Sequence, residues 1–121
     1  MIKEIKTIDD FLDTIKSTKK DYNGKLEKCS VIVIDFFATW CGPCEMIAPK
    51  FDKLSEKYKT VGFYKINIDD MDIQEVVNSN NISSLPTFCL FKYGSCVAKI
   101  MGTDIEKIEK QIIQYLSKEE F

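Results

Sequence analysis

Apolar residues along the chain follow two spacings, one typical of buried strands and one typical of helices. Residues 31–38 are apolar at every position except Asp35, as in a strand covered on both faces of a parallel or mixed sheet. Residues 41–58 carry apolar side chains at helical intervals, and Pro49 is expected to kink this helix. With a further strand over residues 63–68, these segments predict a right-handed strand–helix–strand unit.

The remaining segments predict a central mixed sheet of about five strands, flanked on both faces by about four helices. Thr7 and Thr103 each open a sequence with the spacing of a capping box, which predicts that a helix begins there. Tyr93-Gly94 predicts a tight hairpin turn. The other predicted elements are a strand over residues 2–6, helices over 8–18 and 72–78, an exposed polar loop over 17–30, strands over 87–92 and 95–101, and a last helix with the apolar stripe Ile105, Ile108, Ile112 and Leu116. This order indicates an α/β fold.

Length and charge narrow the class of protein. The 121 residues make one domain, which we place at residues 1–121. A net charge of -2, with lysines scattered among acids, disfavours a nucleic acid partner. No apolar run approaches membrane-spanning length, and the first residues lack the apolar core of a signal peptide. We therefore expect a cytoplasmic monomer with no membrane partner.

Two of the five cysteines lie where the buried strand gives way to a helix, in Trp40-Cys41-Gly42-Pro43-Cys44. The helix N-terminus favours a thiolate at Cys41, and Cys44 lies close enough for a reversible disulfide. We expect Cys41 to be the exposed nucleophile and Cys44 the inner, resolving thiol. The three other cysteines are Cys29, Cys89 and Cys96, and unpaired thiols of this kind favour a reducing compartment. We interpret them as small apolar fillers, or, in the case of Cys29, as an exposed site of oxidation.

Structural zinc and an unrelated pair of buried thiols are the alternatives to a redox pair. Zinc needs further ligands, but the chain has no histidine and no second Cys-x-x-Cys. Cys89 and Cys96 could complete four thiolates, yet both fall in predicted strands, where alternate side chains point to opposite faces. We therefore predict no metal site.

The Trp40–Cys44 motif, with Asp35 six residues ahead of Cys41 and Leu85-Pro86-Thr87 downstream, resembles the thioredoxin family. The resemblance extends from Ile2 to Leu116. It implies the thioredoxin fold and a dithiol carrier that reduces disulfides in client proteins without a bound cofactor. It also implies recharging by a flavin-dependent thioredoxin reductase that uses NADPH, and clients such as peroxiredoxins and ribonucleotide reductase.

The same resemblance gives two charged residues a role. It implies that Asp35 lies beneath the disulfide and shuttles a proton for Cys44, with Lys65 nearby. A buried carboxyl suits this role because burial disfavours its charged form. The alternatives are an Asp35 that is hydrogen-bonded at a bend and a Lys65 that is merely an exposed edge lysine.

A flat apolar docking surface is expected around the nucleophile, because Trp40 directly precedes it. We assign Gly42, Pro43 and Leu85 to the same surface. Two further residues are assigned to substrate binding by the resemblance: Pro86 as the cis-proline that frees the backbone before it, and Gly102 as a bare surface near the site. Without the resemblance, we would interpret Pro86 as a proline at the start of a strand and Gly102 as part of a turn or bulge.

Pro43 favours a reductase, because in the family proline at this position accompanies a strongly reducing pair. Glu45 is a departure: the familiar members carry lysine or arginine there, and a carboxylate disfavours a nearby thiolate. Two alternatives to a reductase remain, an isomerase-like oxidant and a non-catalytic adaptor that uses the fold only for binding.

Overall fold

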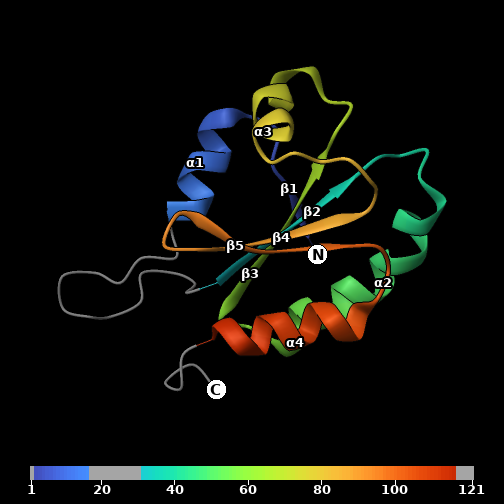
Figure 1. Cartoon of the computed structure of the whole chain (residues 1–121), viewed down its shortest axis with the longest axis vertical. Coiled ribbons are helices and arrows are strands. Elements are labelled where there is room, and N and C mark those ends of the chain that lie inside the picture. Colours follow the sequence, from blue (N-terminus) through green and yellow to red (C-terminus); the bar gives the residue numbers. More distant parts are fainter. Residues whose placement is uncertain (1, 17–30, 117–121) are drawn as a thin grey trace.

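The computed structural model describes residues 2–16 and 31–116; the loop predicted over 17–30, with Cys29, lies outside these ranges. Within the described residues, five strands form one mixed sheet in the order β1-β3-β2-β4-β5 (Figure 1). β3 runs parallel to β1 and β2, whereas β4 runs antiparallel to β2 and β5. The strands are β1 (Lys3–Glu4), β2 (Val31–Phe37), β3 (Val61–Asn67), β4 (Thr87–Lys92) and β5 (Ser95–Met101). The predicted mixed sheet is confirmed.

Helices cover both faces of this sheet. They are α1 (Ile8–Lys16), α2 (Gly42–Lys57), the 3₁₀ turn η1 (Met71–Ile73) with α3 (Gln74–Ser79), and α4 (Ile105–Tyr115). Figure 1 shows α1 and α3 on one side of the sheet and α2 and α4 on the other. No helix among these described segments has the length and apolar character needed to cross a membrane.

Alternation along β2 builds one apolar core on each face. Val31 and Val33 pack with residues of α2 and α4, whereas Ile32 and Ile34 pack with residues of α1 and α3. Asp35 continues the first of these two series. Its carboxyl group therefore lies on the face covered by α2, in the strand that leads directly to the start of that helix.

Hydrogen bonds at the helix starts bear out one predicted cap and correct another. Thr7 Oγ1 accepts a hydrogen bond from Asp10 N at 3.1 Å, as predicted. The cap predicted at Thr103 is wrong: α4 begins one residue later, and Asp104 Oδ1 accepts from Lys107 N at 3.2 Å. Asp104 is an equally good cap, and its negative charge is favoured by the positive end of the helix dipole.

The hairpin between β4 and β5 has the predicted two-residue turn. Tyr93 and Gly94 have φ of 55° and 81°, the backbone of a type I′ turn. The first strand is shorter than predicted, Lys3–Glu4 rather than residues 2–6, because β1 pairs with β3 alone at the edge of the sheet. Pro49 lies inside α2, which continues to Lys57.

Candidate active site

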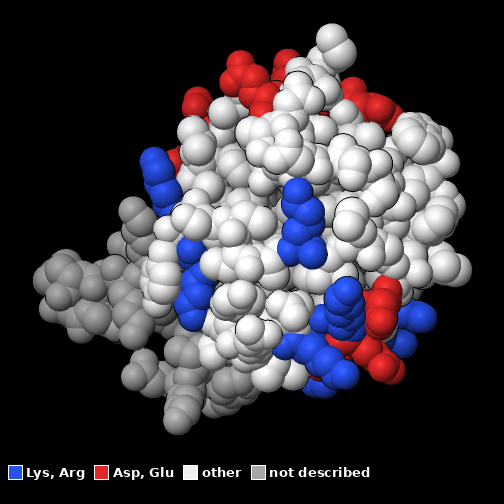
Figure 2. All heavy atoms as spheres, in the orientation of Figure 1, with Lys and Arg blue, Asp and Glu red and all other residues white. Residues whose placement is uncertain are grey.

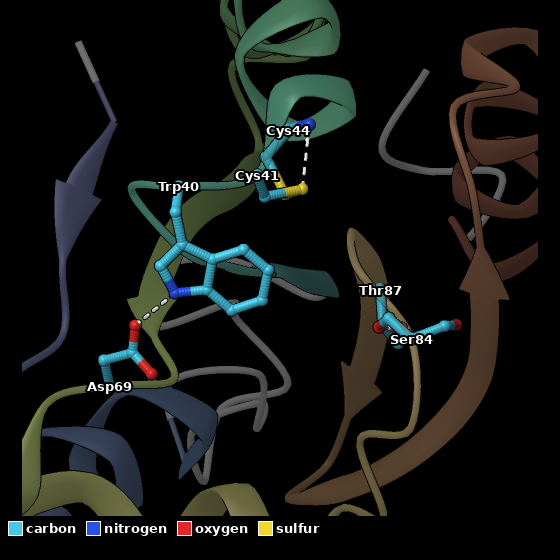
Figure 3. The surroundings of a disulfide bond; sticks show 6 residues. All are labelled: Trp40, Cys41, Cys44, Asp69, Ser84 and Thr87. Carbon is cyan, nitrogen blue, oxygen red and sulfur yellow. Dashed lines mark hydrogen bonds between the residues drawn. A yellow bond between two sulfur atoms is a disulfide. The ribbon is translucent and has the colours of Figure 1, made fainter.

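A disulfide bond joins Cys41 and Cys44 at the N-terminus of α2 (Figure 3). Their Cα atoms are 5.3 Å apart. Cys41 is the N-cap residue, with an extended backbone, and Cys44 lies in the first turn. Pro43 suits this turn because its nitrogen needs no hydrogen-bond acceptor there. The pairing predicted from the spacing of the two cysteines is confirmed.

The two sulfurs have different surroundings. Cys41 Sγ accepts a hydrogen bond from the backbone N–H of Cys44 at 3.2 Å (Figure 3). This amide is one of the helix N–H groups that have no carbonyl partner within the helix. When the disulfide is reduced, the same N–H and the positive end of the helix dipole favour negative charge on the Cys41 sulfur.

Exposure does not distinguish the two cysteines, so the prediction that Cys41 is the exposed one is wrong. Cys41 is 6% exposed and Cys44 5%. Both pack with Ala38, Phe37 and neighbouring apolar side chains, while Trp40 is the exposed residue at 70%. The two cysteines also differ in the cavity that each one lines.

Cys41 lines an open groove of about 470 Å³ that contains no charged residue. The groove includes every residue predicted for the apolar docking surface. In Figure 2 the surface at the loop between β2 and α2 is correspondingly free of charged side chains. Its lining is Trp40, Cys41, Gly42, Pro43, Ile68, Ile82, Ser83, Ser84 and Leu85. The segment 82–84 and Ile68 were not predicted to take part.

Pro86 and Gly102 lie side by side at the end of the sheet that carries this groove. The Leu85–Pro86 peptide bond is cis, as the resemblance implied. The Pro86 carbonyl oxygen accepts a hydrogen bond from Gly102 N at 3.0 Å. Gly102 has a φ of 99°, and a Cβ atom on it would meet nothing within 4 Å, so the surface there is bare as expected.

Sequence reasoning missed Asp69, which holds the exposed tryptophan. The indole Nε1 of Trp40 donates a hydrogen bond to Asp69 Oδ2 at 2.7 Å (Figure 3). Asp69 is fixed in turn by its own backbone N–H, which donates to Asn67 Oδ1 at 3.0 Å. Trp40 and Asp69 each follow a strand, β2 or β3, and the carboxyl ends of parallel neighbours meet at one edge of a sheet. The position of both residues directly after neighbouring parallel strands was the sequence signal from which this contact could have been predicted.

Cys44 lines a second, smaller cavity of about 250 Å³, together with Asp35 and Lys65. Asp35 is 5% exposed, and its Oδ1 has no hydrogen-bond partner. Oδ1 therefore does not support the alternative in which hydrogen bonds hold this acid at a bend. The cavity is completed by Phe37, Ala38, Thr39, Glu45 and Ala48.

Burial raises the pKa of Asp35 to about 7, and the charge of Lys65 lowers it by a smaller amount. Lys65 lies opposite Asp35 in the register of β2 and β3, so it is on an inner strand and half-buried rather than an exposed edge lysine. Its ammonium group also lies 5.4 Å from the ring centroid of Phe37. The cavity thus places a carboxyl group that exchanges its proton near neutral pH next to Cys44.

Cys89 and Cys96 depart from two predictions. The register of the β4–β5 hairpin places Cys96 opposite Phe91, which lies two residues from Cys89 in β4, so both thiols lie on one face of the sheet and not on opposite faces as we predicted. Cys89 is a fully buried filler, as expected, but Cys96 is exposed. In the described ranges, no three Cys, His, Asp or Glu side chains gather as a metal site would require.

Comparison with known proteins agrees with this geometry. The thioredoxin family model matches residues 13–117. A thioredoxin of Callithrix jacchus is 38% identical over 116 residues, 96% of this chain and 100% of the relative. The structure of Fasciola hepatica thioredoxin superposes with a TM-score of 0.81 at 30% identity, covering 95% of this chain and 100% of its own.

A third similar protein comes from work on the thiol resolving mechanism of a yeast mitochondrial 1-Cys peroxiredoxin via glutathione/thioredoxin systems. Its structure has a TM-score of 0.78 and 31% identity, over 93% of this chain and 94% of its own. Family match, fold and the Cys41–Cys44 disulfide agree. The chain therefore belongs to the thioredoxin family and is a thiol–disulfide oxidoreductase with Cys41–Cys44 as its redox-active pair.

Proposed function

We propose that this protein reduces disulfide bonds in client proteins, with Cys41 as the nucleophile. The observation that carries the proposal is the hydrogen bond from Cys44 N to Cys41 Sγ at a helix N-terminus, beside an uncharged groove. A thiolate is the attacking species in disulfide exchange, and this environment favours one at Cys41. The groove gives a client disulfide access to that sulfur.

The first step joins client and carrier. The Cys41 thiolate attacks one sulfur of the client disulfide, a bond forms between these two sulfurs, and the client's second sulfur leaves as a thiolate that takes a proton from solvent. Backbone of the client lies along the groove between Trp40 and Leu85. Pro86 and Gly102 form the bare edge against which an extended segment fits.

The second step releases the client. The Cys44 sulfur attacks Cys41, re-forming the Cys41–Cys44 disulfide and expelling the client sulfur as a thiolate. Cys44 must lose a proton for this attack, and Asp35, which lines the same cavity, accepts it. A pKa of about 7 suits Asp35 for this exchange, and Lys65 is the positioning cation beside it.

Recharging the pair requires two electrons, which we assign to a flavin-dependent thioredoxin reductase that uses NADPH. Family membership supports this partner, and the yeast structure supports peroxiredoxins as one class of client. Ribonucleotide reductase is a further candidate client. The presence of thiols outside the active-site pair supports a reducing compartment, and we propose the cytoplasm and a monomeric state.

Insulin reduction coupled to thioredoxin reductase and NADPH tests the proposal. We expect catalytic NADPH consumption and precipitation of the insulin B chain with the native protein, and neither with Cys41→Ser. A non-catalytic adaptor would give no turnover although it is folded. An isomerase-like oxidant would instead reoxidise reduced ribonuclease faster than it reduces insulin, and either result would overturn the proposal.

A further inference from the structure

Cys89 and Cys96 lie on adjacent strands of the β4–β5 hairpin, and the turn sets their relation. Two turn residues place Lys92 opposite Ser95 and Phe91 opposite Cys96. Paired residues of an antiparallel ladder share one face of the sheet, as do alternate residues of one strand. Cys96 therefore lies on the same face as Phe91 and Cys89, diagonally across from the latter.

A β-bulge in the hairpin places a cationic side chain on the same face as these two cysteines. The register shifts between Leu90 and Phe91, so that Lys99 rather than Ala98 lies opposite Cys89. Lys99 Nζ is held by the carbonyl oxygen of Asn80, at 2.6 Å. The hairpin thus gathers two thiols and an ammonium group on one face.

The two thiols are unequal in a way that suits an attacking and a resolving group. Cys96 is exposed on the edge strand β5, whereas Cys89 is fully buried in the core shared with α1 and α3. The interaction between the two thiols lowers the pKa of Cys96 and raises that of Cys89, which burial raises further. The Cys96 thiol itself donates a hydrogen bond to the carbonyl oxygen of Ala98 at 3.5 Å. The charge of Lys99 lowers the pKa of both.

We propose that Cys89 and Cys96 form a second dithiol, which hydrogen peroxide converts into a disulfide across the hairpin. The Cys96 thiolate attacks one peroxide oxygen, and the hydroxide that leaves is protonated to water. Cys89 sulfur then attacks the resulting Cys96 sulfenic acid, and the expelled hydroxide takes the Cys89 proton. Two thiols lose two electrons, and one peroxide becomes two waters.

This dithiol is separate from the active site. Neither cysteine lines the groove at Cys41 or the cavity that holds Asp35 and Cys44. Cys89 belongs to the core on the α1 and α3 face, whereas Asp35 lies on the α2 face. The proposal therefore does not depend on the function proposed above, and the active-site cysteines can be removed for its test.

The experiment uses the full chain with Cys29→Ser, Cys41→Ser and Cys44→Ser, so that only Cys89 and Cys96 remain. The reduced protein is treated with hydrogen peroxide, unfolded, alkylated with N-ethylmaleimide and weighed by mass spectrometry. We expect the loss of two hydrogen atoms and no alkylation. Trypsin cuts after Lys92, between the cysteines, so the Cys89 and Cys96 peptides should then be found joined, and joined only without reductant.

Matched variants assign the two roles in the same background. Adding Cys89→Ala should stop oxidation at the Cys96 sulfenic acid, captured with dimedone. Adding Cys96→Ser should leave Cys89 reduced, because it is buried, with circular dichroism confirming that both variants fold. Three results would overturn the proposal. Cys96 could be oxidised beyond the sulfenic acid while Cys89 is still alkylated, or disulfides could form only between chains. The third is no reaction under conditions that oxidise free N-acetylcysteine. All three can be read in the background protein even if a variant does not fold.

Discussion

Asp35 lies directly opposite Lys65 in the parallel register of β2 and β3, yet the lysine does not keep the carboxyl group fully ionised at neutral pH. Burial raises the pKa of Asp35 to about 7, and this exceeds the opposing effect of the lysine charge. A group whose pKa differs between the folded and unfolded states makes stability depend on pH. The proton of Asp35 is therefore coupled to folding, and in the proposed mechanism it is coupled to the chemistry at Cys44 as well.

We predict that the free energy of unfolding of the oxidised protein falls as pH rises from about 4 to about 7. In this window the unfolded chain, with an ordinary Asp35 pKa of 3.8, has released the proton while the folded protein holds it. Above the window the loss is complete, on the order of 4 kcal/mol from the size of the pKa difference. Asp35→Asn should remove this loss, so the variant should be more stable than the native protein near pH 8 and similar to it near pH 4. Denaturant melts across pH measure both.

The oxidised form is the right one for these melts, because its disulfide sulfurs do not titrate. Lys65→Met provides the companion variant: without the cation the pKa of Asp35 should rise further, and the window should extend to higher pH. If the native protein and Asp35→Asn give parallel stability curves, Asp35 is not the group that titrates in the cavity.

Asp35→Asn should also slow client reduction, because asparagine cannot accept the proton of Cys44. General bases contribute about 10²–10⁴-fold, so we expect a loss of about ten-fold or more at neutral pH. Single-turnover reduction of insulin by the reduced protein gives the rate. Asp72→Asn, at an exposed acid outside the cavity, is the control and should keep the native rate. Equal rates for the native protein and both variants would contradict the proton-accepting role.

Cys44→Ser should accumulate mixed disulfides with client proteins, whereas Cys41→Ser should accumulate none. The reason is the order of steps that we propose, in which Cys41 makes the bond to the client and Cys44 breaks it. Non-reducing gels of each variant incubated with oxidised insulin show the adducts, and reductant should remove them. Because both cysteines are almost equally buried, accumulation by both variants would mean that the helix N–H does not select the nucleophile.

The elements of the fold could be predicted because their apolar spacing is unambiguous. Val31–Phe37 is apolar on both faces apart from Asp35, and the stripe on α4 matches the buried Ile108 and Ile112. The disulfide followed from its spacing at a strand–helix junction, and Trp40, Gly42 and Pro43 in the groove from their place beside it. Each of these depends on local sequence alone.

The features that were missed depend on relations between segments. Whether Cys41 is exposed depends on Ile68 and Leu85, which come from loops elsewhere in the chain. The placement of Cys89 and Cys96 on one face depends on strand register, which alternation within one strand does not set. Thr103 and Asp104 are both good helix caps, so sequence could not decide between them. No local pattern carried this information.

Glu45→Lys should move the alkylation of reduced Cys41 to lower pH. Glu45 is exposed on the first turn of α2, where a cation in place of an anion favours the nearby thiolate. Iodoacetamide alkylation followed across pH measures the midpoint, and added salt should reduce the shift. Glu56→Lys makes the same change at an exposed position near the other end of α2 and should leave the midpoint unchanged. Equal shifts in both variants would indicate an effect of net charge rather than of Glu45.

Gly102→Ala should destabilise the protein by about 1–3 kcal/mol through backbone strain. The φ of Gly102 is 99°, which an L-residue with a Cβ atom rarely adopts, although no atom within 4 Å would clash with that Cβ. Gly42→Ala is the matched change: its Cβ would also lie in open space, but Gly42 is the first residue of α2, where alanine should stabilise by about 0.4–1 kcal/mol. Denaturant melts of both oxidised variants give the two free energies. Neither site crowds a Cβ atom. If both substitutions changed the free energy of unfolding in the same way, backbone strain at Gly102 would not be the cause. The change would instead come from the loss of flexibility common to any glycine replacement.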